Sequence, residues 1–244
     1  MNKKLVGIII AIVILVAAVV GVIYLVSNDS LNKDSNENSK ALGTTIKTNK
    51  VEEKEANMVE DEEEDKDELD KKILIAYFSR ADENYEVGNV DVGNTEIMAG
   101  FIKDYLGDKA DAFKIDPVKP YPVSYKECTE VATKEQRENA RPEFKNADSL
   151  NIDDYDVIFL GYPIWWGDVP MIINTFLEKY DFSGKTIIPF NTHEGSGISG
   201  TYTSIKNKMK DSNVNTNGLA IDGVAARKES SRSTVESWLK GLGY

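Results

Sequence analysis

Two adjacent tryptophans, Trp165 and Trp166, lie in a short segment that follows a strongly apolar run of the chain. The run, residues 156–162, is predicted to be a buried parallel strand, and the segment Pro163 to Gly167 follows as a loop. Open α/β sheets bind their ligands at the carboxyl ends of the strands. Because neighbouring residues of an extended segment point to opposite sides, both indoles cannot enter one core. At least one is expected to face a cleft where a flat, ring-shaped cofactor covers it, and packing of both under the loop is the alternative.

Two further loops are expected at the same edge of the sheet. The first, residues 79–94, leads into a helix through Gly93, Asn94 and Thr95, and the free N–H groups of a helix N-terminus suit a phosphate. An ordinary helix cap is the simpler explanation of these residues, and the chain lacks both G-x-G-x-x-G and G-x-x-x-x-G-K-[ST]. The second loop, residues 191–200, is rich in glycine and serine, which predicts adaptable backbone groups near a ligand.

The elements that position these loops alternate between apolar runs and amphipathic stretches. This pattern predicts βαβ units, and therefore an α/β fold with a parallel sheet covered by helices on both faces. Strands are expected at residues 72–78, 111–115, 156–161, 186–191 and 219–221. Helices are expected at residues 95–106, 124–139, 170–180, 200–209 and 232–242. Asn94 or Thr95 is the expected cap of the first helix, and Ser231 or Ser233 that of the last.

The first 70 residues are expected to lie outside the folded domain. Residues 1–4 form a short basic N-terminus, and residues 5–26 contain no charged side chain. A helix of that length measures about 33 Å, enough to cross the hydrocarbon core of a bilayer. A cleaved secretory signal is the alternative, but its apolar region is usually only about 7–15 residues long. We therefore predict a single-pass anchor in the cell membrane, with the folded domain on the extracytoplasmic side.

Residues 27–70 are polar, and residues 51–70 hold 12 acidic residues against Lys54 and Lys66. A segment of this kind, without apolar periodicity, is predicted to be a disordered acidic linker. The expected domain, residues 71–244, carries a net charge of −5. Nucleic acid is therefore excluded as a partner, because its recognition requires a basic surface. With one cysteine, Cys128, and one histidine, His193, the chain offers no internal disulfide and no set of metal ligands.

Residues 71–244 resemble the flavodoxin superfamily. The resemblance is carried by residues 77–85, by Gly93-Asn94-Thr95 and by residues 161–167, with further matches at residues 139–142, 183–186 and 192–197. It implies a flavodoxin-like three-layer α/β/α sandwich whose five-stranded parallel sheet has the order 2-1-3-4-5. It also implies that the domain binds FMN non-covalently.

The resemblance further implies which residues contact FMN. The phosphate would be held by Ser79, Arg80, Asn94 and Thr95. The isoalloxazine ring would lie along Pro163, Ile164, Trp165, Trp166 and Gly167. Its other edge would be closed by Thr192, His193, Glu194, Gly195, Ser196 and Gly197. Gly167 is the candidate catalytic residue, because a glycine peptide can turn to accept a hydrogen bond from N5 of the reduced flavin. The insertion of residues 80–92 departs from the shorter loop of ordinary flavodoxins.

The function expected from these features is a membrane-anchored FMN protein that carries electrons between redox partners. The chain has no identifiable nicotinamide-binding motif, which favours a carrier. An FMN-dependent reductase of quinones or similar small molecules, using NAD(P)H, is the enzyme alternative. A flavin-binding module without turnover is the third possibility. The partners would be redox proteins or a small-molecule electron acceptor, and the sequence leaves the oligomeric state open.

Overall fold

The computed structural model describes residues 71–244. The predicted basic N-terminus, membrane anchor and acidic linker, residues 1–70, lie outside the described residues. None of the helices within residues 71–244 has both the length and the apolar character needed to cross a bilayer.

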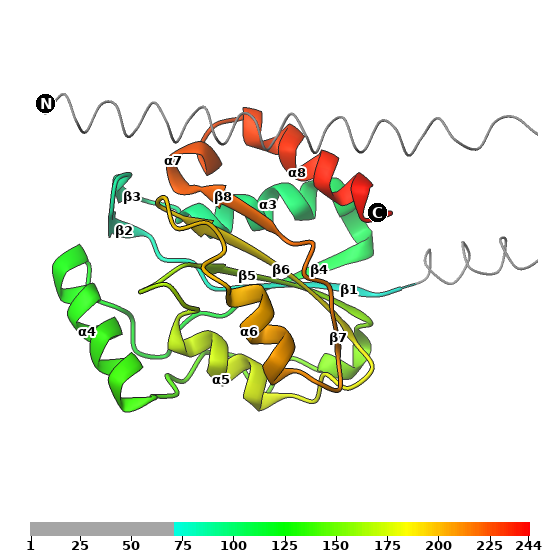
Figure 1. Ribbon diagram of the computed structural model, residues 1–244, viewed down its shortest axis with the longest axis horizontal. Coiled ribbons are helices and arrows are strands. Elements are labelled where there is room, and N and C mark those ends of the chain that lie inside the picture. The colour runs from blue at the N-terminus through cyan, green and yellow to red at the C-terminus, as the bar shows by residue number, and fades with distance from the viewer. Residues whose placement is uncertain (1–70) are drawn as a thin grey trace, which may run out of the picture. The chain divides into compact units, whose positions relative to one another are not determined.

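A parallel sheet forms the middle layer of the fold (Figure 1). Its strands are β1 (Ile73–Tyr77), β4 (Ala110–Lys114), β5 (Val157–Pro163), β6 (Thr186–His193), β7 (Asn213–Val214) and β8 (Leu219–Asp222). The order is β4-β1-β5-β6, and both β7 and β8 pair with β6. The predicted order 2-1-3-4-5 is confirmed for the first four positions, but the fifth position is divided between two short strands.

A proline accounts for this division of the edge strand. Ile187 accepts a 2.9 Å hydrogen bond from Asn215 N, so the backbone of Ile187 faces the fifth position. Pro189 lies two residues further along β6 and therefore faces the same side, but a proline has no N–H to donate. The fifth position pairs with Thr186 and Ile187 through β7, and pairing resumes at Phe190 through β8.

Helices cover both faces of the sheet, as the sequence predicts (Figure 1). One face carries α3 (Asn94–Leu106), the short α7 (Gly223–Ala226) and α8 (Ser230–Gly241), and the opposite side carries α4 (Tyr125–Glu138), α5 (Met171–Lys179) and α6 (Thr201–Lys208). Alternate residues of β5 enter two separate buried clusters: Ile158 and Leu160 pack with residues of α5 and α6, whereas Phe159 packs with residues of α3 and α8. The three-layer α/β/α architecture is confirmed.

Several local expectations are wrong. The insertion of residues 80–92 contains an antiparallel pair, β2 (Asp82–Asn84) and β3 (Gly88–Val90), which its polar sequence did not indicate. The helix caps also differ from the prediction. Gly93 is the N-cap of α3, and Glu229 precedes α8 without a side-chain cap. Ser231 lies inside α8 and donates a 2.7 Å hydrogen bond to Ala225 O. Two short 3₁₀ helices, η1 (Gly107–Lys109) and η2 (Ile152–Asp154), precede β4 and β5.

Candidate functional site

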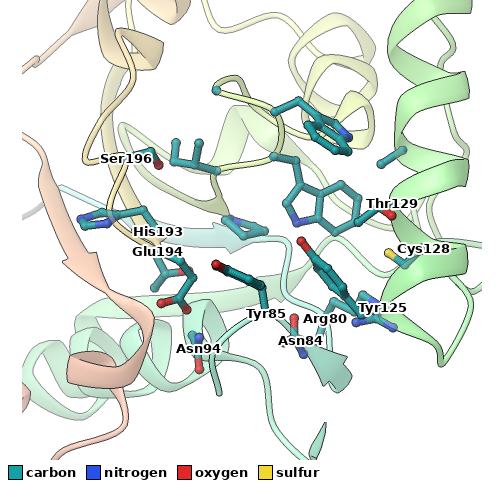
Figure 2. Close-up of a pocket in the computed structure, with 17 residues that line it drawn as sticks. Arg80, Asn84, Tyr85, Asn94, Tyr125, Cys128, Thr129, His193, Glu194 and Ser196 are labelled. Atoms are coloured by element: carbon teal, nitrogen blue, oxygen red, sulfur yellow. The ribbon is translucent and has the colours of Figure 1, made fainter. Parts of the chain in front are cut away.

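The three predicted loops meet around one cavity of about 280 Å³, shown in Figure 2. Its walls are formed by Arg80, Asn84, Tyr85, Asn94, Tyr125, Cys128, Thr129, Ala132, Pro163, Ile164, Trp165, Trp166, Gly167, Thr192, His193, Glu194 and Ser196. Of the predicted site residues, Ser79, Thr95, Gly195 and Gly197 do not line it. Within residues 71–244 no cluster of histidine, cysteine, aspartate or glutamate is arranged to hold a metal ion.

Part of the cavity wall was not predicted. Asn84 and Tyr85 come from the β2–β3 hairpin, and Tyr125, Cys128 and Ala132 come from α4. Figure 2 shows Asn94 and Glu194 on one side of the cavity, with Tyr125 and Cys128 on the side of α4. The spacing of residues 125, 128 and 132 in an otherwise polar helix is a helical apolar stripe, which could have indicated this wall. Burial raises the pKa of the Cys128 thiol despite the nearby Arg80, so the thiol is protonated at neutral pH.

Ser79 and Thr95 do not line the cavity but hold α3 in place beside it through hydrogen bonds. The Ser79 hydroxyl oxygen accepts a 3.0 Å hydrogen bond from the backbone N of Glu96, and so caps α3 from the end of β1. A Cβ atom on Gly93 would come within 2.3 Å of both Arg80 O and Ser79 Oγ. The Thr95 and Thr192 hydroxyls, both buried, lie 2.8 Å apart and join α3 to β6. These contacts fix the N-terminus of α3 against the loop after β1.

Arg80 is a buried cation with one unsatisfied donor. Its two terminal nitrogens donate to the backbone carbonyls of Glu83, Pro122 and Val123, the last at 2.6 Å. The side chain is only 9% exposed, and its Nε has no hydrogen-bond partner among the described residues. A buried donor without a partner is costly, particularly on a charged group. Because Arg80 lines the cavity, its guanidinium adds a positive charge to the wall, which suits an anionic ligand.

The side chains of the two tryptophans lie in different environments, as expected from the sequence. Trp165 is half-buried and meets Phe78 and Tyr121 edge-on, with ring centroids 5.3 and 5.0 Å away. Trp166 is 59% exposed. Trp165 N donates to Asp168 O at 2.9 Å and Asp168 N returns a bond of 3.0 Å to Trp165 O. With φ of 52° at Trp166 and 75° at Gly167, this is the pattern of a two-residue type I′ turn.

The loop that follows β6 is held in place by the buried side-chain amide of Asn191. Thr192 and His193 belong to β6 itself rather than to the predicted loop. Asn191 donates a 3.1 Å hydrogen bond to Gly197 O and accepts one of 2.6 Å from the Tyr202 hydroxyl. His193 Nδ1 accepts a 3.1 Å hydrogen bond from Gly195 N, which orients the imidazole along the loop. The loop is thereby folded back over the end of its own strand.

Glu194 is the acidic group of the cavity. Burial, followed by the charges of Asp222 and Glu86, raises its pKa to about 7. A Cβ atom on Gly223 would come within 2.0 Å of Glu194 Oε1 and within 2.3 Å of Asn94 Nδ2. The carboxyl of Glu194 and the amide of Asn94 therefore approach the same point, next to a glycine that leaves room for both.

Comparisons with known proteins agree with this architecture. A family model described as flavodoxin matches residues 72–241. A protein from Bacteroides eggerthii DSM 20697, whose structure is described as that of a flavoprotein, is 31% identical, with a TM-score of 0.56 over 71% of this chain and 99% of that chain. A similarly described protein from Bacteroides uniformis ATCC 8492 is 29% identical, with a TM-score of 0.54 over 70% and 98%. A search of curated proteins found no match.

Proposed function

Because this chain belongs to the flavodoxin family, we propose that residues 71–244 bind FMN in the cavity and use it to carry electrons between redox partners. One observation carries the proposal. The aromatic side chains that are exposed within residues 71–244 are Tyr85, Tyr125 and Trp166, at 54%, 38% and 59%, and all three line this cavity. Large aromatic groups gathered at one opening are typical of a site that a flat apolar ligand covers.

The residues present fit FMN. At one end of the cavity, Asn94 and the N-terminus of α3 would hold the phosphate, since a helix N-terminus offers free N–H groups and a positive dipole end. Arg80 also lines the cavity, and its guanidinium would offer a positive charge to an anionic cofactor. Trp165, Trp166 and Tyr85 would cover the isoalloxazine, and exclude water from it. Bound FMN supplies one- and two-electron transfer chemistry, which no side chain of the cavity offers by itself.

A second candidate function is an FMN-dependent reductase of quinones or similar small molecules. The observation that favours it is the wall of the cavity on α4. There Cys128 and Ala132 line a part of the cavity that is not formed by the residues predicted to hold FMN. A small acceptor could lie there beside the cofactor, whereas a protein partner would approach from the exposed Trp166.

Steady-state turnover separates the two functions. We expect the FMN-loaded protein to oxidise NADH and NADPH with quinones at a negligible rate, and to accept electrons only when a partner reductase is added. The measurement is the loss of nicotinamide absorbance with and without the reductase, and FMN alone in solution is the control. Rapid turnover without any partner would reject the carrier and establish the reductase.

Gly167 provides a prediction about the loop at the isoalloxazine. Its φ of 75° is tolerated by asparagine but strains alanine, so Gly167→Asn preserves the turn while limiting its freedom to rearrange. We expect Gly167→Asn to bind FMN normally but to reduce the separation between the two one-electron reduction steps in an anaerobic dithionite titration. Gly167→Ala should weaken FMN binding as well. An unchanged separation in Gly167→Asn would remove Gly167 from this role.

We also propose that the uncharged residues 5–26 anchor the protein in the cell membrane, with the domain on its extracytoplasmic side. The support is the length and composition of that segment, which would keep the domain near membrane-bound redox partners. Protease treatment of intact cells tests the orientation, because only an external domain is degraded.

A further inference from the structure

Arg227, which no sequence pattern singled out, reaches the end of the cavity where the phosphate of FMN is proposed to lie. It follows α7, and its Nη1 donates to Val92 O at 2.8 Å and to Asn94 Oδ1 at 3.1 Å. These bonds fix the amide of Asn94, because its oxygen is held by Arg227. The Nδ2 group is consequently turned the other way, toward Gly223 and the carboxyl of Glu194.

Glu194 stands in surroundings that disfavour its charge. Asp222, at the end of β8, accepts hydrogen bonds of 3.1 and 3.2 Å from Val224 N and Ala225 N, and its negative charge acts on Glu194. Glu86, on the turn between β2 and β3, adds a second negative charge, and the Arg227 guanidinium is hydrogen-bonded to Asn94 rather than to Glu194. Within residues 71–244 no ion pair is formed by Glu194. A further anion placed beside Asn94 would repel an ionised Glu194 strongly.

We propose that Glu194 couples cofactor binding to proton uptake, carrying a proton whenever the FMN phosphate lies beside Asn94, and that Arg227 is the positioning residue that turns the Asn94 amide toward that phosphate. The inference rests on the proposed function, since it concerns the same cofactor. When protonated, Glu194 becomes a donor to a phosphate oxygen, whereas the ionised carboxylate only accepts. The arrangement makes the site selective for a phosphorylated flavin and sensitive to pH.

The sign of the pH dependence follows from the ordinary linkage of proton and ligand binding. Below a pH of about 7 Glu194 is already protonated, and FMN binds without further proton uptake. Above that pH a proton must be taken from solution, so the affinity for FMN falls by up to about tenfold per pH unit. Riboflavin has no phosphate, so its affinity should change little over the same range.

The test is to titrate the flavin-free full-length protein with FMN and with riboflavin at pH 7.0, 7.75 and 8.5, following the quenching of flavin fluorescence. Glu194→Gln keeps the size of the side chain and removes its ionisable group, and Glu143→Gln is the matched control at an exposed position that does not line the cavity. The phosphate's own second pKa, about 6, affects all variants equally. We expect the Kd for FMN to rise about tenfold or more between pH 7.0 and 8.5 in the wild type and in Glu143→Gln, and to stay constant in Glu194→Gln.

Arg227→Gln tests the positioning role in the same titration. We expect it to weaken FMN binding by roughly threefold to tenfold, as for the loss of one hydrogen bond, and to leave riboflavin binding unchanged. A merely structural role would weaken both ligands alike. Equal pH slopes in the wild type and Glu194→Gln, or equal slopes for FMN and riboflavin, would overturn the inference while leaving FMN as the cofactor. Failure of every variant to bind FMN at any of these pH values would instead reject the proposed function.

Discussion

Replacing Gly93 with alanine is expected to abolish FMN binding and to destabilise the domain by about 1–3 kcal/mol. The added Cβ would come within 2.3 Å of Arg80 O and Ser79 Oγ, and within 2.8 Å of Arg80 C. Two of these three atoms belong to the backbone, so the end of β1 must shift away from α3. That shift would break the cap that Ser79 provides to Glu96 N and move the helix N-terminus proposed to hold the phosphate.

Gly100→Ala is the matched control for this change. It lies in the same helix, and a Cβ there meets no atom within 4 Å. Alanine in a helix interior is favoured over glycine by about 1 kcal/mol, so this variant should be as stable as the wild type or more stable. Urea unfolding and FMN titration of both variants provide the comparison. Normal FMN affinity in Gly93→Ala would contradict the proposed place of the phosphate.

Replacing each tryptophan with alanine is expected to affect the stability of the domain differently, while both replacements weaken FMN binding. Trp165→Ala should destabilise the domain by about 2–4 kcal/mol, because its indole packs edge-on against Phe78 and Tyr121. Trp166 is 59% exposed, so Trp166→Ala should change stability by no more than about 0.5 kcal/mol. Both variants should lose FMN affinity, Trp166→Ala by roughly tenfold or more, since stacking on an aromatic side chain is worth about 1–3 kcal/mol.

The measurements are thermal unfolding of the cofactor-free protein and the Kd for FMN, for both variants. If Trp166→Ala binds FMN as tightly as the wild type, the exposed indole does not cover the cofactor. If Trp165→Ala is as stable as the wild type, its ring contacts contribute nothing to the core.

The sheet was largely predictable because its central strands are covered on both faces. β1 and β5 begin with unbroken runs of isoleucine, leucine, valine and phenylalanine, and β6 contains Ile187, Ile188 and Phe190, which is typical of such strands. The divided edge was not predictable from apolar periodicity, because its cause is the missing N–H of Pro189 on the neighbouring strand. The β2–β3 pair was not predicted because neither strand has a buried residue, so its sequence shows no alternation of apolar and polar residues.

The residues of the candidate site were also predictable only in part. Residues within the loops after β1, β5 and β6 were predictable, because strand ends determine where those loops converge. The contact of Arg227 with Val92 joins residues 135 positions apart and has no local sequence signal. The contact of Ser79 with a phosphate stays a prediction. Its role as a cap of α3 was not predictable from the sequence, because it depends on how closely Gly93 lets the two segments approach.

The most direct test of the account is the identity and amount of chromophore in the purified full-length protein. We predict a visible flavin spectrum and, after denaturation, release of one FMN per chain, identified by mass. If the protein is isolated without cofactor, added FMN should restore the spectrum at the same ratio. A colourless protein that does not bind added FMN would contradict the central claim, because the cavity would then serve a different ligand.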